Sequence, residues 1–510
     1  MIGMGKKREA VKDRSGVPGN SECNLDGNFQ IPIRSLKDLS GDTIRVTIAR
    51  SRYVQILLAA TIIGFFLRFY DLGFNSLWLD EASTLTFAVK SIPEIWQATT
   101  GGEFNPPLFY WVEHLMLTFG NSEVILRFVP ALLGALSIPI IYLAGREFID
   151  RNVGIIAATA FAFSPFLVYY SQEARAYSMM LFFVTFSLVF YFRALKNNTA
   201  RDWAFFGLLS ALAFWSHFYA LVIVGALVLY ALYVLVPKIR ADLRVARPVL
   251  LAAAVFAIIS LPLILVTIQL FALRTASAPT FGIQGPDLII ATFAQISGSD
   301  MAMYILLILF IAGIIQAFLM DKNKGLFLVS VVILTFVISN FLSYRIPMQP
   351  RYLIFMAAVF FITIALSYKL LSSRWNSPAV VYGFLALLLI INIPMLAGYY
   401  SGYTKEDWRG LSGQVQQLTK PGDRIVLVPG YLYQPFDYYY SNKTYGTIEL
   451  YADNEKSLEA IYTGNRNSTI YYVVTGDITS ADPTGGAINW LEKNTKFLGN
   501  RNGISLLVSG

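Results

Sequence analysis

The chain has 510 residues, of which 55% are hydrophobic and only 14% are charged, and its formal net charge is +8. A soluble globular protein carries about a quarter charged residues, so this composition excludes an ordinary soluble enzyme and favours a protein embedded in lipid. The positive charge does not indicate nucleic-acid binding, because Lys and Arg gather at the ends of apolar runs rather than in one stripe.

Residues 1–52 are polar and basic and contain no early apolar segment of the signal-peptide kind, so we expect a flexible cytoplasmic tail. Eleven apolar segments then follow within 53–400, and an apolar segment of roughly 20 residues crosses a hydrocarbon core as a helix. We place the spans at 53–70, 125–145, 153–170, 177–194, 203–217, 219–236, 249–271, 302–320, 325–343, 352–370 and 378–398. The shorter run 106–119 is expected to lie at the interface. The fold class is therefore a polytopic α-helical membrane protein.

The distribution of Lys and Arg gives the expected orientation. With the N-terminus inside, the inner segments hold 23 of these residues, and the outer segments before residue 401 hold seven. Because cytoplasmic loops carry the excess, we expect a multi-pass plasma-membrane protein with a cytoplasmic N-terminus and an extracytoplasmic C-terminus. The long segment 71–124 is then the first outer loop.

From residue 401 to residue 510 the composition changes to Gly, Asn, Asp and Thr between short β-rich runs. This pattern predicts a small extracytoplasmic α/β domain. Its expected strands are 424–428, 469–474 and 504–508, and its expected helices include 408–419 and 486–493. The tyrosine-rich segment 431–440 is predicted to supply a strand and a helix of the core, with contacts to sugars as the alternative.

Charged groups beside a membrane are costly, and in this topology they gather on the outer side. Asp80 and Glu81 follow an aromatic run in the first loop. A carboxylate there can act as a general base toward a hydroxyl, whereas the simpler interpretation is a solvated helix cap. In the next outer turn we expect Glu173 to orient an acceptor and Arg175 to clamp a phosphate, with simple snorkelling of both as the alternative.

Further outer residues complete the expected site. His217 lies at a tight turn, where a structural role competes with ligand binding. Arg345 and Arg351, the latter followed by Tyr352, are cations on the outer side and indicate an anionic, lipid-borne ligand. Asn105 caps a helix that begins with a proline pair and returns the loop to the site. The sequence contains no metal-ligand spacing, so we expect no metal or other cofactor.

These motifs resemble the membrane glycosyltransferases of the GT-C class, in particular the prokaryotic, family 39-like branch of the protein mannosyltransferase and aminoarabinose transferase superfamily. The residues that carry the resemblance are Asp80-Glu81, Pro106-Pro107-Leu108, Leu126 to Ala131, Tyr170 to Tyr177, Arg351-Tyr352-Leu353 and Glu406 to Gly410. The resemblance implies that a sugar is transferred, with inversion, from a polyprenyl-phosphate carrier to a protein, lipid or glycan acceptor at the outer face.

The same resemblance implies roles for individual residues. Asp80 takes the place of the family's base, Glu81 that of its neighbouring acid, and Arg175, Arg351 and Arg345 lie near the carrier phosphate. The chain departs from the family pattern at Asn105, where many relatives have His, and it lacks an acid two residues before the first proline of the pair. A bound divalent cation is therefore the alternative to a site without metal, although the sequence shows no clear set of ligands for it.

Two other classes of protein compete with a hexosyl- or pentosyltransferase. A transporter or flippase of lipid-linked sugars typically shows inverted repeats and midplane charges in broken helices, and the spans show neither clearly. A non-catalytic membrane subunit of a glycan assembly complex would tolerate the loss of Asp80. We favour the transferase because the charges gather on one face of the membrane.

Overall fold

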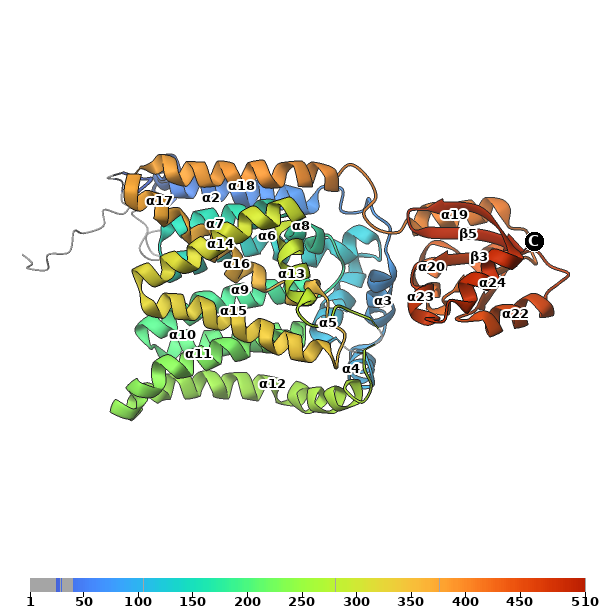
Figure 1. The fold of residues 1–510 in the computed structure, drawn as a ribbon, viewed down its shortest axis with the longest axis horizontal. Coiled ribbons are helices and arrows are strands. Elements are labelled where there is room, and N and C mark those ends of the chain that lie inside the picture. Colours follow the sequence, from blue (N-terminus) through green and yellow to red (C-terminus); the bar gives the residue numbers. More distant parts are fainter. Residues whose placement is uncertain are drawn as a thin grey trace, which may run out of the picture.

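The computed structural model describes residues 24–27, 29, 40–103, 105–279, 281–375 and 377–509. Two parts follow one another along the long axis: a bundle of helices and, at one end of it, a small α/β unit (Figure 1). The expected tail, residues 1–52, lies mostly outside the described residues. Where it is described, Gly41–Arg50 forms helix α1, and the Ser40 side chain caps it by accepting a hydrogen bond from the Thr43 amide.

In the described part of the chain, nine helical segments are long and apolar enough to cross a membrane. They are α2 (Arg52–Phe69), α6 (Glu123–Phe148), α9 (Tyr177–Asn197), α11 (Ala220–Ala241), η3–α12 (Leu243–Arg274), α14 (Asp300–Met320), α15 (Lys322–Ser343), α16–α17 (Met356–Trp375) and α18 (Pro378–Tyr399). The bent pair α7 (Arg151–Phe163) and α8 (Pro165–Ser171) makes a tenth. The eleventh expected span is α10 (Ala200–Ser216), a helix of 17 residues that packs against α9 and α12. The predicted polytopic helical fold is confirmed.

The bend between α7 and α8 is 59°. Pro165 cannot donate the backbone hydrogen bond that would continue α7, and the Ser164 side chain caps the new helix by accepting from the Leu167 amide. The short second helix then ends at Ser171, so the turn that carries Glu173 and Arg175 lies at the same end of the bundle as the α/β unit.

The segment 71–124, which we expect to be the first outer loop, is largely helical and lies between the bundle and the α/β unit (Figure 1). It contains α3 (Leu79–Ala88), α4 (Ile92–Thr100), α5 (Pro107–Met116) and the 3-10 turn η2 (Leu117–Phe119). The run 106–119 is thus one short helix and a turn, and α5 packs against α3, α4 and α10. Farther along the chain, α13 (Asp287–Ser297) packs against the 3-10 turn η4 (Pro350–Leu353).

The C-terminal unit is a five-stranded sheet in the order β2-β1-β3-β5-β4. β1 (Arg424–Val428) is parallel to β2 (Ile448–Tyr451) and β3 (Ile470–Thr475), whereas β5 (Ile504–Ser509) is antiparallel to β3 and to β4 (Thr495–Arg501). Its helices are α19 (Trp408–Leu418), α20 (Tyr433–Tyr439), α21 (Asn442–Tyr445), α22 (Glu455–Gly464), α23 (Ile478–Ala481) and α24 (Gly486–Asn494), with the 3-10 turn η5 (Gly430–Leu432). The predicted small α/β sheet is confirmed.

The tyrosine-rich segment 431–440 differs from the prediction, because it contains no strand and forms the end of η5 and helix α20. Phe436 and Tyr440 are four residues apart and therefore lie on one side, where both are buried in the core beside α19. Tyr438 and Tyr439 are left to contact the first outer loop.

Candidate active site

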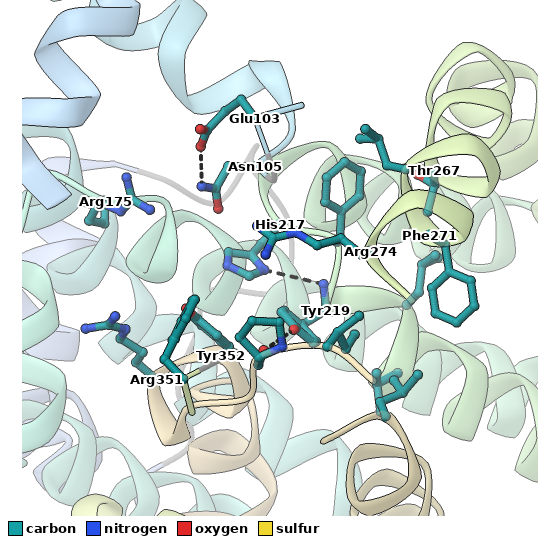
Figure 2. A pocket seen from close by; sticks show the side chains of 18 of the residues that line it. Glu103, Asn105, Arg175, His217, Tyr219, Thr267, Phe271, Arg274, Arg351 and Tyr352 are labelled. Atoms are coloured by element: carbon teal, nitrogen blue, oxygen red, sulfur yellow. Dashed lines mark hydrogen bonds between the residues drawn. The ribbon is translucent and has the colours of Figure 1, made fainter. Parts of the chain in front are cut away.

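A cavity of about 400 Å³ lies at the end of the bundle that faces the α/β unit. One part of its wall is polar and is formed by Asp80, Glu103, Asn105, Arg175, His217 and Arg351. The rest is mainly apolar and comes from α11, α12, the end of α15 and the segment that follows it, with Leu221, Val222, Leu270, Phe271, Leu342 and Ile346. Figure 2 shows Arg175 and Arg351 on one side of this space and Phe271 on the other. The cavity therefore suits a ligand with an anionic head and an apolar tail.

Two arginines flank Asp80, which lies in the first turn of α3. The Asp80 Oδ2 atom is 3.5 Å from Nη2 of Arg351. Arg175 donates to the backbone carbonyl of Asp80 at 3.2 Å and to Thr84 Oγ1 at 3.4 Å. Arg351 also lies over the rings of Trp78 and its neighbour Tyr352, at 5.5 and 5.6 Å from the ring centres. Asp80 and two of the three predicted cations, Arg175 and Arg351, thus line one cavity.

Glu81 points away from this cavity although it is the next residue in the chain. Its carboxylate is fully buried and accepts from Arg127 Nε at 2.7 Å, from Arg127 Nη2 at 2.6 Å and from the Ala174 amide at 2.8 Å. The Nζ atom of Lys405 is 3.2 Å away. Burial, the largest effect, raises the pKa of Glu81, but Arg127 and Lys405 together outweigh it and bring the pKa down to about 2. This position does not suit the catalytic role that we expected for Glu81. It suits a role in holding α3 in place.

Glu173 is also buried behind the cavity rather than in its wall. Neither carboxylate oxygen has a hydrogen-bond partner among the described residues, and the nearest cation is Lys405, whose Nζ atom is 3.7 Å from Oε2. Burial raises the pKa of Glu173 to about 7, while Lys405 acts in the opposite direction. The prediction that Glu173 contacts an acceptor therefore does not fit its position.

Of the remaining predicted residues, some line the cavity and one lies outside it. His217 and Tyr352 line the cavity with their ring centres 5.6 Å apart, and the Tyr219 amide donates to Nδ1 of His217 at 3.4 Å. Asn105 lines it as well, but the prediction that it caps the helix is wrong, because Pro106 is the N-cap of α5 and the Asn105 side chain donates to Glu103 at 2.7 Å. Arg345 is exposed beyond the end of α15 and is absent from the cavity wall, so the expectation that it binds substrate is not supported.

The sequence reasoning missed three residues at the site. Arg274, at the end of α12, lines the cavity, and it showed the same sequence signal as Arg351, a cation on the side expected to face outward. Glu103 accepts from Asn105 and from Tyr110, whose hydroxyl is 2.8 Å away. Lys405 had no sequence signal, because only the tertiary fold brings it to Glu81. Within the described ranges, no three His, Cys, Asp or Glu side chains converge as metal ligands would.

Comparison with known proteins gives one family match and one relative among curated proteins. Residues 105–265 match the model of the dolichyl-phosphate-mannose-protein mannosyltransferase family. An uncharacterized protein of Aquifex aeolicus (strain VF5) is 28% identical over 134 residues, which are 25% of this chain and 27% of that relative. The chain thus aligns with only about a quarter of this relative's length.

Solved structures extend the likeness to nearly the whole chain. ArnT from Cupriavidus metallidurans in the apo state superposes with a TM-score of 0.57 at 13% identity, covering 89% of this chain and 97% of ArnT. The same protein bound to undecaprenyl phosphate gives 0.56, at 13% identity and 89% and 98% coverage. The archaeal oligosaccharyltransferase AglB from Archaeoglobus fulgidus, in complex with an inhibitory peptide and a dolichol-phosphate, gives 0.51 at 15% identity, with 89% and 74% coverage. The chain has the fold of these membrane glycosyltransferases, and its resemblance to the GT-C class is confirmed.

Proposed function

We propose that this protein transfers a hexose or a pentose from a polyprenyl-phosphate carrier to a hydroxyl of a protein, lipid or glycan acceptor, with inversion, at the outer face of the membrane. The observation that carries the proposal is the composition of the cavity wall. A carboxylate and two guanidinium groups lie at one end, and apolar side chains of α11, α12 and α15 line the other. A prenyl phosphate has the same division between an anionic head and an apolar chain.

The cations suit the leaving group. As the bond between the sugar and the phosphate breaks, negative charge develops on the phosphate, and preorganised donors that face this charge stabilise the transition state. Arg351 and Arg175 present planar donor groups that pair well with phosphate oxygens. A carrier phosphate is also what ArnT holds in one of the superposed structures, and AglB holds a dolichol-phosphate in another.

Asp80 suits the other half of the reaction. Its carboxylate takes the proton of the acceptor hydroxyl while the oxygen attacks the anomeric carbon from the face opposite the phosphate. The new bond forms as the phosphate leaves with the electron pair of the old one, so the configuration at this carbon inverts. Removing a general base of this kind typically costs about 10²–10⁴-fold in rate.

The charge distribution supports the outer location, since Asp80 lies at the end of the bundle opposite the side rich in Lys and Arg. Reporter fusions check this orientation. A reporter after residue 50 should be active only in the cytoplasm, and one after residue 420 only outside. The same side for both fusions would contradict the proposed location.

The transfer itself is tested with purified full-length protein in proteoliposomes. Synthetic polyprenyl-phosphate hexoses and pentoses serve as donors, membrane extracts serve as acceptors, and mass spectrometry detects the added sugar. We expect a mass increase of one hexose or one pentose with wild type and none with Asp80→Asn. Movement of the donors between leaflets without any transfer would favour the flippase alternative.

A further inference from the structure

The segment 404–409 links the last span to the α/β unit and is bound to the part of the first outer loop that precedes α3. The backbone amides of Thr404 and Lys405 donate to Oδ1 of Asn75 at 2.9 and 3.3 Å. Ser76 continues the contact, because its hydroxyl donates to Asp407 at 3.3 Å and accepts from the Arg409 amide at 3.1 Å. We call residues 404–409 the docking segment.

A second set of contacts holds the docking segment and α20 against the same loop. Arg409 Nη2 is 2.5 Å from Oε1 of Glu123, the first residue of α6. The Tyr439 hydroxyl donates to the same Glu123 atom at 2.7 Å and accepts from the Leu77 amide at 2.8 Å. The backbone on the N-terminal side of α3 is thus fixed by the C-terminal unit.

Lys405 extends from the docking segment into the helix bundle. Only 2% of its side chain is exposed. Its Nζ atom is 3.2 Å from Glu81, 3.7 Å from Glu173 and 3.4 Å from the carbonyl of Gln172, and it lies over the Tyr169 ring at 5.4 Å from the centre. The C-terminal unit therefore contributes a buried cation to two carboxylates of the membrane part.

The cations paired with Glu81 and Glu173 indicate the role of Lys405. Arg127 is the only other cation paired with either carboxylate in the described chain, and it is already held by both oxygens of Glu81. Without Lys405, Glu173 would have no paired cation, and its buried carboxylate would have to take up a proton at neutral pH, which lowers stability. The surroundings would have to rearrange, and Glu81, adjacent to Asp80, is the other carboxylate that Lys405 contacts.

We propose that Lys405 is a positioning residue of the active site, which fixes Asp80 toward the cavity by holding Glu81 and Glu173 behind it. It does not line the cavity and touches no reacting atom. The expected effect on catalysis rests on the proposed function. The positioning of α3 is a property of the fold and can be measured without turnover.

The experiment compares full-length Lys405→Met, Lys405→Arg and the double variant Lys405→Met/Glu173→Gln in nanodiscs. Lys420→Met is the matched control, because Lys420 is an exposed lysine of the same C-terminal unit. Hydrogen exchange followed by mass spectrometry reports the opening of residues 79–88. Transfer kinetics use the polyprenyl-phosphate sugar that wild type turns over, and binding is measured with undecaprenyl phosphate.

We expect Lys405→Met to speed amide exchange in residues 79–88 at least tenfold and to lower kcat at least tenfold, with the donor KM within twofold of wild type. The double variant should recover most of both losses, because it removes the carboxylate that Lys405 balances, and Lys405→Arg should retain most of the rate. Wild-type exchange and kcat in Lys405→Met, or no recovery in the double variant, would overturn the proposal. If wild type transfers no sugar, the proposed function fails while the exchange measurement still decides the role of Lys405.

Discussion

Replacing Asp80 by Asn should change the rate of transfer and the binding of the carrier phosphate in different ways. Asn keeps the size of the side chain and most of its hydrogen bonding but cannot take the proton of the substrate hydroxyl that attacks the sugar. The turnover number should fall by at least about 10²-fold, the lower end for the loss of a general base. The same substitution removes a negative charge 3.5 Å from Nη2 of Arg351, so binding of the carrier phosphate should change in the opposite direction.

The size of the binding effect follows from this distance. Two unit charges 3.5 Å apart attract by about 1 kcal/mol with the dielectric constant of water and by about 5 kcal/mol with an effective value of 20. Because the side chains of Arg351 and Asp80 are 22% and 24% exposed, solvent screening favours the lower figure. A gain of about 1 kcal/mol corresponds to roughly fivefold tighter binding. We therefore expect slower transfer together with a lower Kd for undecaprenyl phosphate.

The assay measures transfer in proteoliposomes and carrier binding by isothermal calorimetry on the same preparation. Asp71→Asn is the matched control, because Asp71 is an exposed acid of the same loop. Its φ of 51° lies in a region that Asn adopts readily, so the backbone should not change. Near wild-type transfer by Asp80→Asn would refute the assignment of the base, and weaker carrier binding would refute the charge argument.

Three further predictions follow from the same geometry. Arg351→Lys should raise the donor KM at least fivefold, since Lys keeps the charge but loses the planar donor pair. Arg345→Lys, outside the cavity, should leave the donor KM unchanged. Equal donor kinetics for the two variants would remove Arg351 from the phosphate site. Glu81→Gln should lower the free energy of unfolding by about 3–5 kcal/mol, because Arg127 is left buried without its carboxylate, and a thermal melt within 1 °C of wild type would contradict this. Burial raises the pKa of Glu173 to about 7 from 4.5, so the folded state binds this proton more tightly than the unfolded state does. Wild type should therefore lose stability relative to Glu173→Gln as the pH rises from about 4.5 to 7, and a constant difference in melting temperature would exclude this titration.

The spans and most of the sheet were predictable from the sequence for a local reason. An apolar run of about 20 residues has few alternatives to a membrane helix, and all eleven predicted segments coincide with helices of the bundle. The strands at 424–428 and 504–508 are short apolar runs bounded by turn residues, and β1 and β5 are found there. The tyrosine-rich segment was harder, because aromatic residues favour strands in general but here are spaced to place Phe436 and Tyr440 on one side of a helix.

The site was predictable only in part, because a sequence gives the side of the membrane on which a residue lies but not the direction of its side chain. Asp80 and Glu81 are neighbours of identical charge, yet one lines the cavity and the other is buried against Arg127. Arg345 and Arg351 lie in one loop, yet only Arg351 returns to the cavity because η4 turns the chain inward. Lys405 is separated from Glu81 by most of the membrane domain, and no local pattern connects them.

The position of Lys405 has a consequence for the biogenesis of the protein. Ribosomes deliver the chain from its N-terminus at about 5–20 residues per second, so the carboxylate of Glu81 emerges on the order of 15–65 s before the ammonium group that pairs with it. Every membrane helix after α2 is synthesised during that interval. The nascent protein thus holds its buried acids without their second cation until α18 has been made, and the catalytic geometry is completed at one of the last steps of maturation. A ribosome that stalls before codon 405 would leave an inserted bundle in which Asp80 is not yet fixed.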